Sequence, residues 1–213
     1  MRRIMLAAAA IGVAITAGAC HKTGSNAGKD LSNPGGSAPV NAVQDAAAGA
    51  VGAASGLVAP TTADGFVNAA TIANTYEIEA GKIAEQRASS ADVKALARMI
   101  VADHTRIGQE MASTLKSEGL DITPPNELDE RRKGMLDNLR QAGDSDFDLA
   151  YLHQQLAAHI EALELMKGYA DHGDNPALKA LAAKTAPVIQ KHLDEVKRIG
   201  GDKLQAAAPG GNG

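Results

Sequence analysis

Apolar residues recur every three or four positions through four long segments of the chain, and this spacing limits the fold more than any other feature of the sequence. An α-helix has 3.6 residues per turn, so the spacing places the apolar side chains of each segment on one helical face. The predicted helices cover about residues 62–87, 91–117, 146–170 and 176–199. The clearest stripe, in 146–170, includes Leu149, Leu152, Leu156 and Leu163.

Residues that begin and end helices separate the four segments. Ser90 and Asn175-Pro176 are typical of helix N-termini, whereas Gly119 and Pro124-Pro125 follow the second segment. A shorter helix is expected at about residues 126–141. Only 2% of the residues are aromatic, which favours closely packed helices over a β-sandwich. The sequence therefore predicts an all-α fold, a four-helix bundle with an additional short connecting helix.

The first 19 residues are typical of an export signal: two arginines, an apolar run and the small residues Ala17-Gly18-Ala19. The single cysteine of the chain, Cys20, follows at once, as in a bacterial lipobox, although Ala17 stands where a leucine is usual. We therefore expect a lipid on Cys20 that anchors the protein to a membrane, as in a periplasmic outer-membrane lipoprotein. The alternative is ordinary cleavage and a soluble periplasmic or secreted protein.

Composition divides the rest of the chain. Residues 20–60 are rich in Gly, Ala, Ser, Asn and Pro and are expected to form a disordered tether, and residues 201–213 a disordered tail. The folded domain is expected at residues 61–200. The formal net charge is −4, and rings that could stack on bases are scarce, so no nucleic-acid partner is expected. Protein partners and oligomeric state are not indicated.

Polar residues interrupt the apolar stripe of each long segment. They are Glu77, His104, His159 and His192. At about 1.5 Å of rise per residue, the four positions reach similar depths in an antiparallel bundle. Such a layer is suited to a transition metal, Zn, Fe, Mn or Cu, with Asp103 and Glu195 as further ligands or as acceptors behind the histidines. Two alternatives stay open: a metal-free hydrogen-bonded His/Glu network and a misread helix register.

Motifs of common enzyme classes are absent from the sequence. It contains no G-x-S-x-G, no Walker sequence and no C-x-x-C, so acyl-transfer, nucleotide-dependent and thiol chemistries lack their parts. No catalytic residue is predicted. His21, His153 and His172 lie off the stripes and are expected to be solvated.

Several of these residues also resemble a known family. The matching stretches are Phe66–Ala70, Glu77–Ala84, Met99–His104, Phe147–Tyr151, His159, and Pro187 with His192-Leu193. Over about residues 62–196 they resemble the bacterial domain-of-unknown-function family 4142. The resemblance implies an exported, ferritin-like helical protein of the kind often labelled an outer-membrane protein. It also implies that the recurrent Glu, Asp-His, His and His of the family fall on Glu77, Asp103-His104, His159 and His192.

The resemblance carries no established activity. Ferritin-like proteins bind two metals through Glu and Glu-x-x-His sets, whereas carboxylates are too few on these stripes for di-iron oxidase chemistry. Two hypotheses follow. In the first, the buried layer binds a transition metal for storage, sensing or redox protection. In the second, the protein is a non-enzymatic envelope or stress interaction module, and the layer is purely structural.

Overall fold

The computed structural model describes residues 59–206, and these residues contain six α-helices and no strand. The helices are α2 (Ala63–Arg87), α3 (Ala91–Ser117), α4 (Glu130–Gln141), α5 (Phe147–His172), α6 (Pro176–Gly200) and α7 (Asp202–Ala206). The predicted all-α class is confirmed. The expected signal segment 1–19, Cys20, the tether up to residue 58 and the last seven residues lie outside the described residues.

Side-chain caps fix the starts of four helices. Thr62, Ser90 and Asp129 each accept a hydrogen bond from the backbone N–H three residues ahead, at the starts of α2, α3 and α4. Asn175 accepts two such bonds at the start of α6, where Pro176 occupies the first turn. These are the donors that an α-helix leaves without a partner in its first turn, so the caps set where each helix begins.

Two boundaries differ from the sequence-based expectation. The connecting helix α4 begins at Glu130 and not near residue 126, because the Asp129 carboxylate accepts from Arg132 N and caps the helix there. Helix α7 lies within the segment expected as a tail, and Leu204 is buried and packs close to Gly200.

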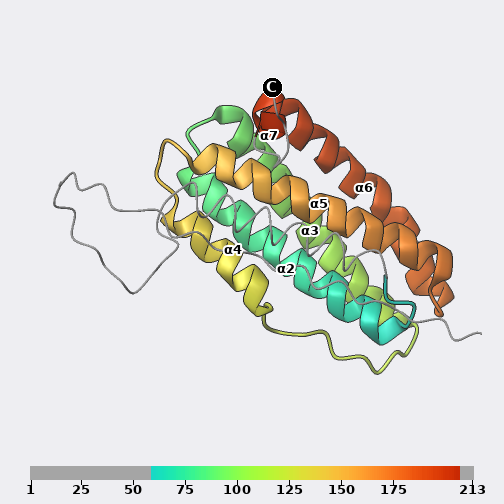
Figure 1. Cartoon of the computed structure of the whole chain (residues 1–213). Helices are drawn as coiled ribbons and strands as arrows, with labels where there is room; N and C mark the ends of the chain where they lie inside the picture. The colour runs from blue at the N-terminus through green and yellow to red at the C-terminus, as the bar shows by residue number, and fades with distance from the viewer. Residues whose placement is uncertain (1–58, 207–213) are drawn as a thin grey trace, which may run out of the picture. The chain divides into compact units, whose positions relative to one another are not determined.

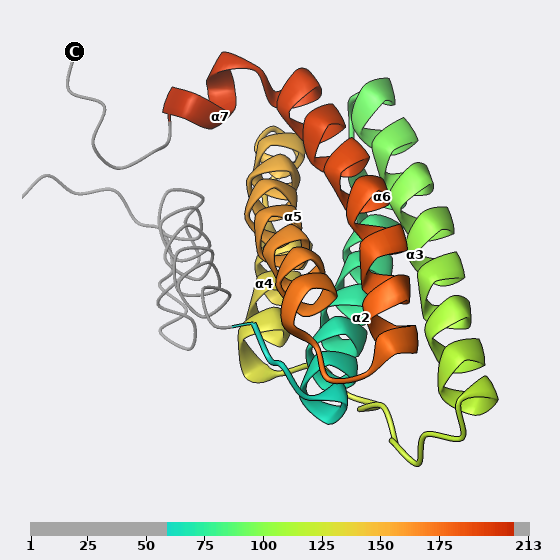
Figure 2. The same ribbon diagram turned by 90° about the vertical axis from the view of Figure 1, so that its right-hand side faces the viewer.

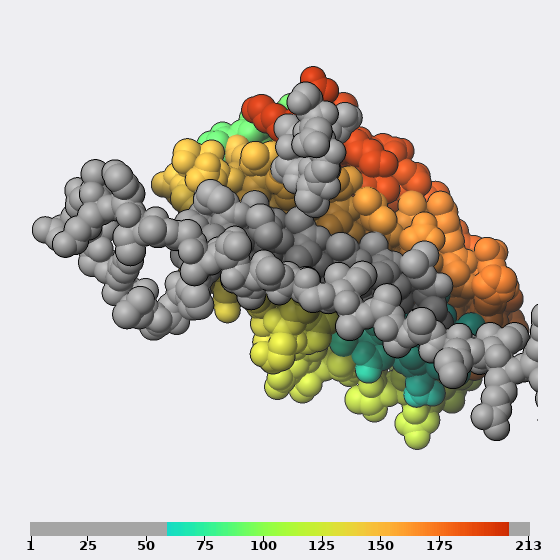
Figure 3. Space-filling model, in the orientation of Figure 1, coloured from blue at the N-terminus to red at the C-terminus, as the bar shows by residue number. Residues whose placement is uncertain are grey.

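The four long helices pack side by side, and the contacting pairs are antiparallel, whereas α3 and α5 run in the same direction because α4 returns the chain between them (Figure 1). The closest pairs are α2 with α3 and α5 with α6, while α3 also packs on α6 and α2 on α5. Viewed from the side, α4 lies against α2 and α5, and the connection from α3 passes under the ends of the helices (Figure 2). The side chains of α5 and α6 meet along one edge of the face shown in Figure 3.

The face that α5 buries differs from the predicted stripe. Leu149 was placed on that stripe, but it is 37% exposed, so this placement was wrong. The buried side chains include Tyr151, Gln154 and Gln155. The reason is that α5 contacts α2, α4 and α6, and a helix covered from several sides does not bury a single narrow stripe.

The apolar core consists of two clusters with the polar layer between them. One cluster includes Leu96 and Ile100, before His104 in α3, and the other includes Ile107 and Met111, after it. Among the described residues, no helix is long and apolar enough to span a membrane.

Candidate metal centre

Three histidines from three helices meet in the interior. His104 of α3, His159 of α5 and His192 of α6 are 4%, 0% and 0% exposed. Their ring centroids lie 5.3 to 5.8 Å apart. One ring nitrogen from each lies within 4.8 Å of the other two. This is the only group of three or more His, Cys, Asp or Glu residues with that proximity found in the described part of the chain.

Helical spacing places His104 and His192 on the buried faces of their helices. His104 lies one turn from both Ile100 and Ile107 in α3, and His192 lies one turn from both Ile189 and Val196 in α6. All four of these aliphatic residues are buried. An imidazole that replaces an apolar side chain at such a position must therefore point into the core.

One ring nitrogen of each histidine forms a hydrogen bond with an oxygen atom. His192 Nε2 lies 2.9 Å from Asp103 Oδ2, His159 Nδ1 lies 2.9 Å from the backbone oxygen of Gln155, and His104 Nδ1 lies 3.0 Å from Asn74 Oδ1. A carboxylate and a carbonyl oxygen only accept hydrogen bonds, so the ring nitrogen facing each of them carries the proton. These three partners assign the tautomer of each ring.

In a neutral imidazole the second nitrogen then presents a lone pair. For His159 this nitrogen is Nε2, and for His192 it is Nδ1; the two face each other at 3.3 Å. For His104 it is Nε2, which is buried and has no hydrogen-bond donor among the described residues. Two lone pairs therefore face each other beside a third ring whose Nε2 has no donor, an arrangement that is unfavourable unless a positive charge lies among the rings.

The 3.3 Å separation fits a metal ion. With Zn–N bonds of about 2.0–2.1 Å, two nitrogens on a zinc tetrahedron lie about 3.3–3.4 Å apart. The facing nitrogens of His159 and His192 are already at this distance. A ring nitrogen of His104 lies within 4.8 Å of the ligand nitrogens of the other two histidines. The oxygens behind the rings correspond to the outer partners that orient metal-binding histidines in proteins.

Burial keeps the three rings neutral. It lowers the pKa of His159 to about 3 and lowers the pKa of His192, while burial and the two neighbouring histidines lower the pKa of His104 well below its usual value. Asp103 acts in the opposite direction on His192. Near neutral pH each ring therefore retains the lone pair that a metal ion requires.

Glu77 is buried beside the cluster, whereas its neighbour Glu79 is partly exposed and pairs with Lys82. Glu77 Oε1 lies 3.7 Å from His159 Nδ1, on the side of that ring away from His192. Burial raises the pKa of Glu77 to about 8, and Gln155 and Arg132 act in the opposite direction. In this arrangement Glu77 is an outer neighbour of the three inward-facing nitrogens.

The two additional candidates are placed differently. Asp103 contacts His192 and also accepts a hydrogen bond from the exposed Arg106 at 2.8 Å, so it forms the solvent side of the centre. Glu195 pairs with Arg198 at 2.6 Å on the outer face of α6 and is not brought to the histidines.

Two residues of the site were not predicted from the sequence. Asn74 lies one turn before Glu77 in α2, and Gln155 lies one turn before His159 in α5. The spacing could have identified them, because a residue three or four positions from a buried polar residue lies on the same face of the helix. Asn74 and Gln155 are polar residues at this spacing from Glu77 and His159, and they could have been predicted as hydrogen-bond partners within the layer.

Comparison with known proteins supports the family and leaves the activity open. The family model described as a domain of unknown function, DUF4142, matches residues 46–199. No curated protein and no solved structure matches the chain. The match covers most of the sequence and all four histidine and glutamate positions of the centre, so the protein belongs to the DUF4142 family.

Proposed function

We propose that this protein binds a single transition-metal ion through His104, His159 and His192. One observation carries the proposal: the outer partners of the rings leave the lone pairs of His159 and His192 facing each other at 3.3 Å, and a ring nitrogen of His104 lies within 4.8 Å of the other two rings. Three protein nitrogens leave a further coordination position, which in zinc sites is filled by water or another small ligand.

The donor set favours particular ions. Imidazole nitrogen suits Zn²⁺, Cu²⁺ and Fe²⁺, whereas Mn²⁺ prefers oxygen ligands. The nearby carboxylates, Glu77 and Asp103, contact the outer nitrogens of His159 and His192 and not the inner ones. We therefore expect Zn²⁺ or Cu²⁺ to bind well and Mn²⁺ to bind weakly.

Residues 59–206 contain a single three-histidine group, which would hold one ion and suits sensing or redox protection better than bulk storage. We further propose that the four long helices form a ferritin-like bundle. The protein would be exported and held at the periplasmic side of a membrane by a lipid on Cys20. The two arginines, the apolar run and the small residues before Cys20 support this location.

The central test is thermal unfolding with and without metal. Purified protein is stripped with a chelator, and unfolding is followed alone and with Zn²⁺, Cu²⁺ or Mn²⁺. Metal at about 100 times its Kd should raise the free energy of unfolding by about 2.7 kcal/mol. The variant His159→Leu should lose this gain, because an inner nitrogen is removed, and its metal-free form should remain folded. The metal content of the protein as purified is measured in parallel.

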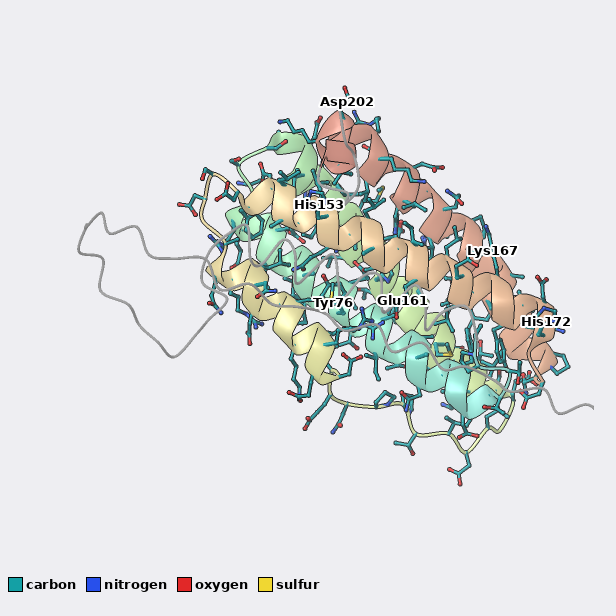
Figure 4. All side chains as sticks on the ribbon, in the orientation of Figure 1. Tyr76, His153, Glu161, Lys167, His172 and Asp202 are labelled. Atoms are coloured by element: carbon teal, nitrogen blue, oxygen red, sulfur yellow. The ribbon has the colours of Figure 1, made fainter. Side chains whose placement is uncertain are left out.

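The matched control is His172→Leu in the same helix. His172 is exposed and is the last residue of α5, where Figure 4 labels it. This variant should keep the full gain. If no ion stabilises the wild type near neutral pH, the layer is a structural His/Glu network. His159→Leu should then cost about 1–3 kcal/mol by leaving partners unsatisfied, without any effect of metal.

The proposed location has its own test. A Cys20→Ser variant should lose detergent partitioning or fail to be processed, because the thiol is the attachment point of the lipid. Wild-type protein recovered in the soluble periplasmic fraction, with an unmodified N-terminus at Cys20, would rule out the anchor. This result would leave the metal proposal unaffected.

A further inference from the structure

A cavity of about 240 Å³ lies among the four long helices and begins within one helical turn of His104. Its lining includes Phe66 and Asn74 of α2, Ile107 and Met111 of α3, Met166 of α5 and Thr185 of α6. Pro124, from the connection between α3 and α4, also contributes. An engineered cavity of about 150 Å³ with a comparable apolar lining binds benzene, so the volume is sufficient for a six-membered ring with a substituent.

The lining excludes ions. It contains no Lys, Arg, Asp, Glu or His. A charged ligand would lose its hydration there without gaining a partner of opposite charge. An uncharged ring would instead remove apolar surface from water on both sides. Phe66, Met111 and Met166 also provide the aromatic and sulfur contacts that favour an aromatic ring over an aliphatic one.

Two hydroxyl groups line the cavity, those of Thr71 and Thr185. Neither forms a hydrogen bond with a described residue, and Thr185 is only 2% exposed, whereas Thr71 is partly exposed. Thr105 and Thr114 in α3 behave differently, since each donates to the carbonyl four residues earlier, at 2.7 and 2.9 Å. The Thr185 hydroxyl is not among the fully buried atoms without a partner, so it is available to a ligand in the cavity that carries one polar group.

We propose that this cavity is a binding site for a small, uncharged aromatic molecule with one hydroxyl group, a phenol. The ring lies against Phe66 and the two methionines, and its hydroxyl forms a hydrogen bond with Thr185. The site does not depend on metal. It borders the metal centre through Asn74, which lines the cavity and accepts a hydrogen bond from His104.

Phenol and toluene are the probes for this site. They are titrated into chelator-treated protein labelled with ¹³C at the methionine methyl groups. Phenol should saturate one site per chain and shift the signals of Met111 and Met166, while those of Met99 and Met135, which do not line the cavity, stay in place. Repeating the titration with bound Zn²⁺ separates this proposal from the metal proposal, because phenol binding should persist in both states.

Two variants test the details, each with a matched control. Thr185→Val should weaken phenol binding about tenfold and leave toluene binding unchanged, since one hydrogen bond is lost at constant shape. The control Thr105→Val should affect neither probe. Ala112→Leu narrows the cavity from an exposed lining position and should weaken both probes, whereas Ala95→Leu, exposed in the same helix, should not.

Three outcomes would overturn the proposal. The first is the absence of a methionine shift at millimolar phenol in folded protein. The second is an equal shift of all methionine signals, which indicates nonspecific binding. The third is an equal loss of phenol and toluene binding in Thr185→Val, because the hydroxyl would then have no specific role.

Discussion

At the scale of single residues, Asp103 decides which nitrogen of His192 faces the other histidines. Its carboxylate accepts from His192 Nε2–H, which leaves a lone pair on Nδ1 opposite His159. Two facing lone pairs are favourable for binding a metal ion and destabilise the metal-free protein. Metal affinity and metal-free stability should therefore respond to changes at Asp103 in opposite directions.

Asp103→Asn tests this opposition. The asparagine amide can donate to His192 Nε2, so the ring proton moves to Nδ1 and donates to His159 Nε2. Metal affinity should fall about 10- to 100-fold, whereas the metal-free protein should be as stable as the wild type or more so. Competition with a coloured chelator measures the affinity, and urea unfolding measures the stability. Glu195→Gln, at the exposed ion pair with Arg198, serves as the control. An unchanged affinity in Asp103→Asn would contradict the tautomer assignment.

Glu77 makes a separate contribution that depends on pH. Its folded-state pKa is raised from 4.5 to about 8, so the folded protein keeps a proton that the unfolded chain releases above pH 4.5. Between these two values, stability therefore decreases as the pH rises, by about 1.4 kcal/mol per pH unit. The buried histidines have the opposite sign: their pKa values are lowered, so stability decreases as the pH falls below about 6.5.

Glu77→Gln isolates the glutamate. Glutamine cannot titrate, and the histidines are the same in both proteins. In chelator-treated protein, the variant should gain about 3 kcal/mol relative to wild type between about pH 5 and about pH 7.5. Urea unfolding at the two pH values measures the difference. If the difference in free energy of unfolding between Glu77→Gln and wild type is the same at both pH values, Glu77 does not hold a proton in the folded state.

The sequence indicated which residues are buried at this centre better than it indicated how they are oriented. Helical periodicity alone brings Glu77, His104, His159 and His192 to one layer, because each replaces an apolar residue. Periodicity does not give side-chain rotamers or partners from other helices. The contact of Asn74 with His104, across 30 residues of sequence, and the outer position of Glu77 therefore required the folded structure.

At the scale of helices, boundaries were predictable where a cap marks them, as at Asn175-Pro176. The buried face of α5 was not, because it depends on how many neighbours surround the helix. The distances between helices could not be predicted from the sequence either. Gly81 in α2 allows α3 to approach so closely that a Cβ atom there would lie 2.5 Å from Val101 Cγ2 and 3.3 Å from the Ala97 backbone oxygen.

Gly81→Ala should therefore destabilise the protein by about 1–3 kcal/mol, although alanine is the better helix former. Val101 is β-branched and turns only with difficulty, so its side chain cannot easily avoid the new methyl group. The cost should be smaller when Val101→Ala is already present. Gly134→Ala in α4, where a Cβ meets no atom within 4 Å, should instead stabilise by up to about 1 kcal/mol. Chemical unfolding of the four variants measures these changes, and equal effects at Gly81 and Gly134 would show that the helices separate at little cost.

At the scale of the whole molecule, the histidine layer lies between two apolar clusters and joins three helices. A metal ion there would link α3, α5 and α6, so binding would stabilise the complete fold and not one local element. Helix α4 provides no histidine and is attached elsewhere, through Arg131 and Arg132 to Glu161 of α5 at 2.8 and 2.9 Å.

The start of the folded domain is also a property of the whole molecule. The sequence placed residues 20–60 in a tether, but the family match begins at residue 46. Residues 46–58 carry no charged side chain, and the first described residue, Ala59, packs so closely on α5 that a Cβ at Gly168 would lie 2.6 Å from its methyl group. The extent of the family match leads us to propose a domain that begins near residue 46, as the alternative to the expected start at residue 61.

Two internal deletions test this limit. Removing residues 21–45 should leave the thermal midpoint unchanged, because this part lies outside the family match. Under this proposal, removing residues 21–58 should lower the midpoint by several degrees, since burying one Val or Leu would contribute about 1.5–3 kcal/mol and 1 kcal/mol corresponds to about 2–4 °C in a domain of this size. Calorimetry on the full chain and both deletions provides the comparison. Equal midpoints for all three proteins would show that residues 46–58 add no stability and that the domain begins near residue 59. A loss already present in the shorter deletion would place the start of the domain before residue 46.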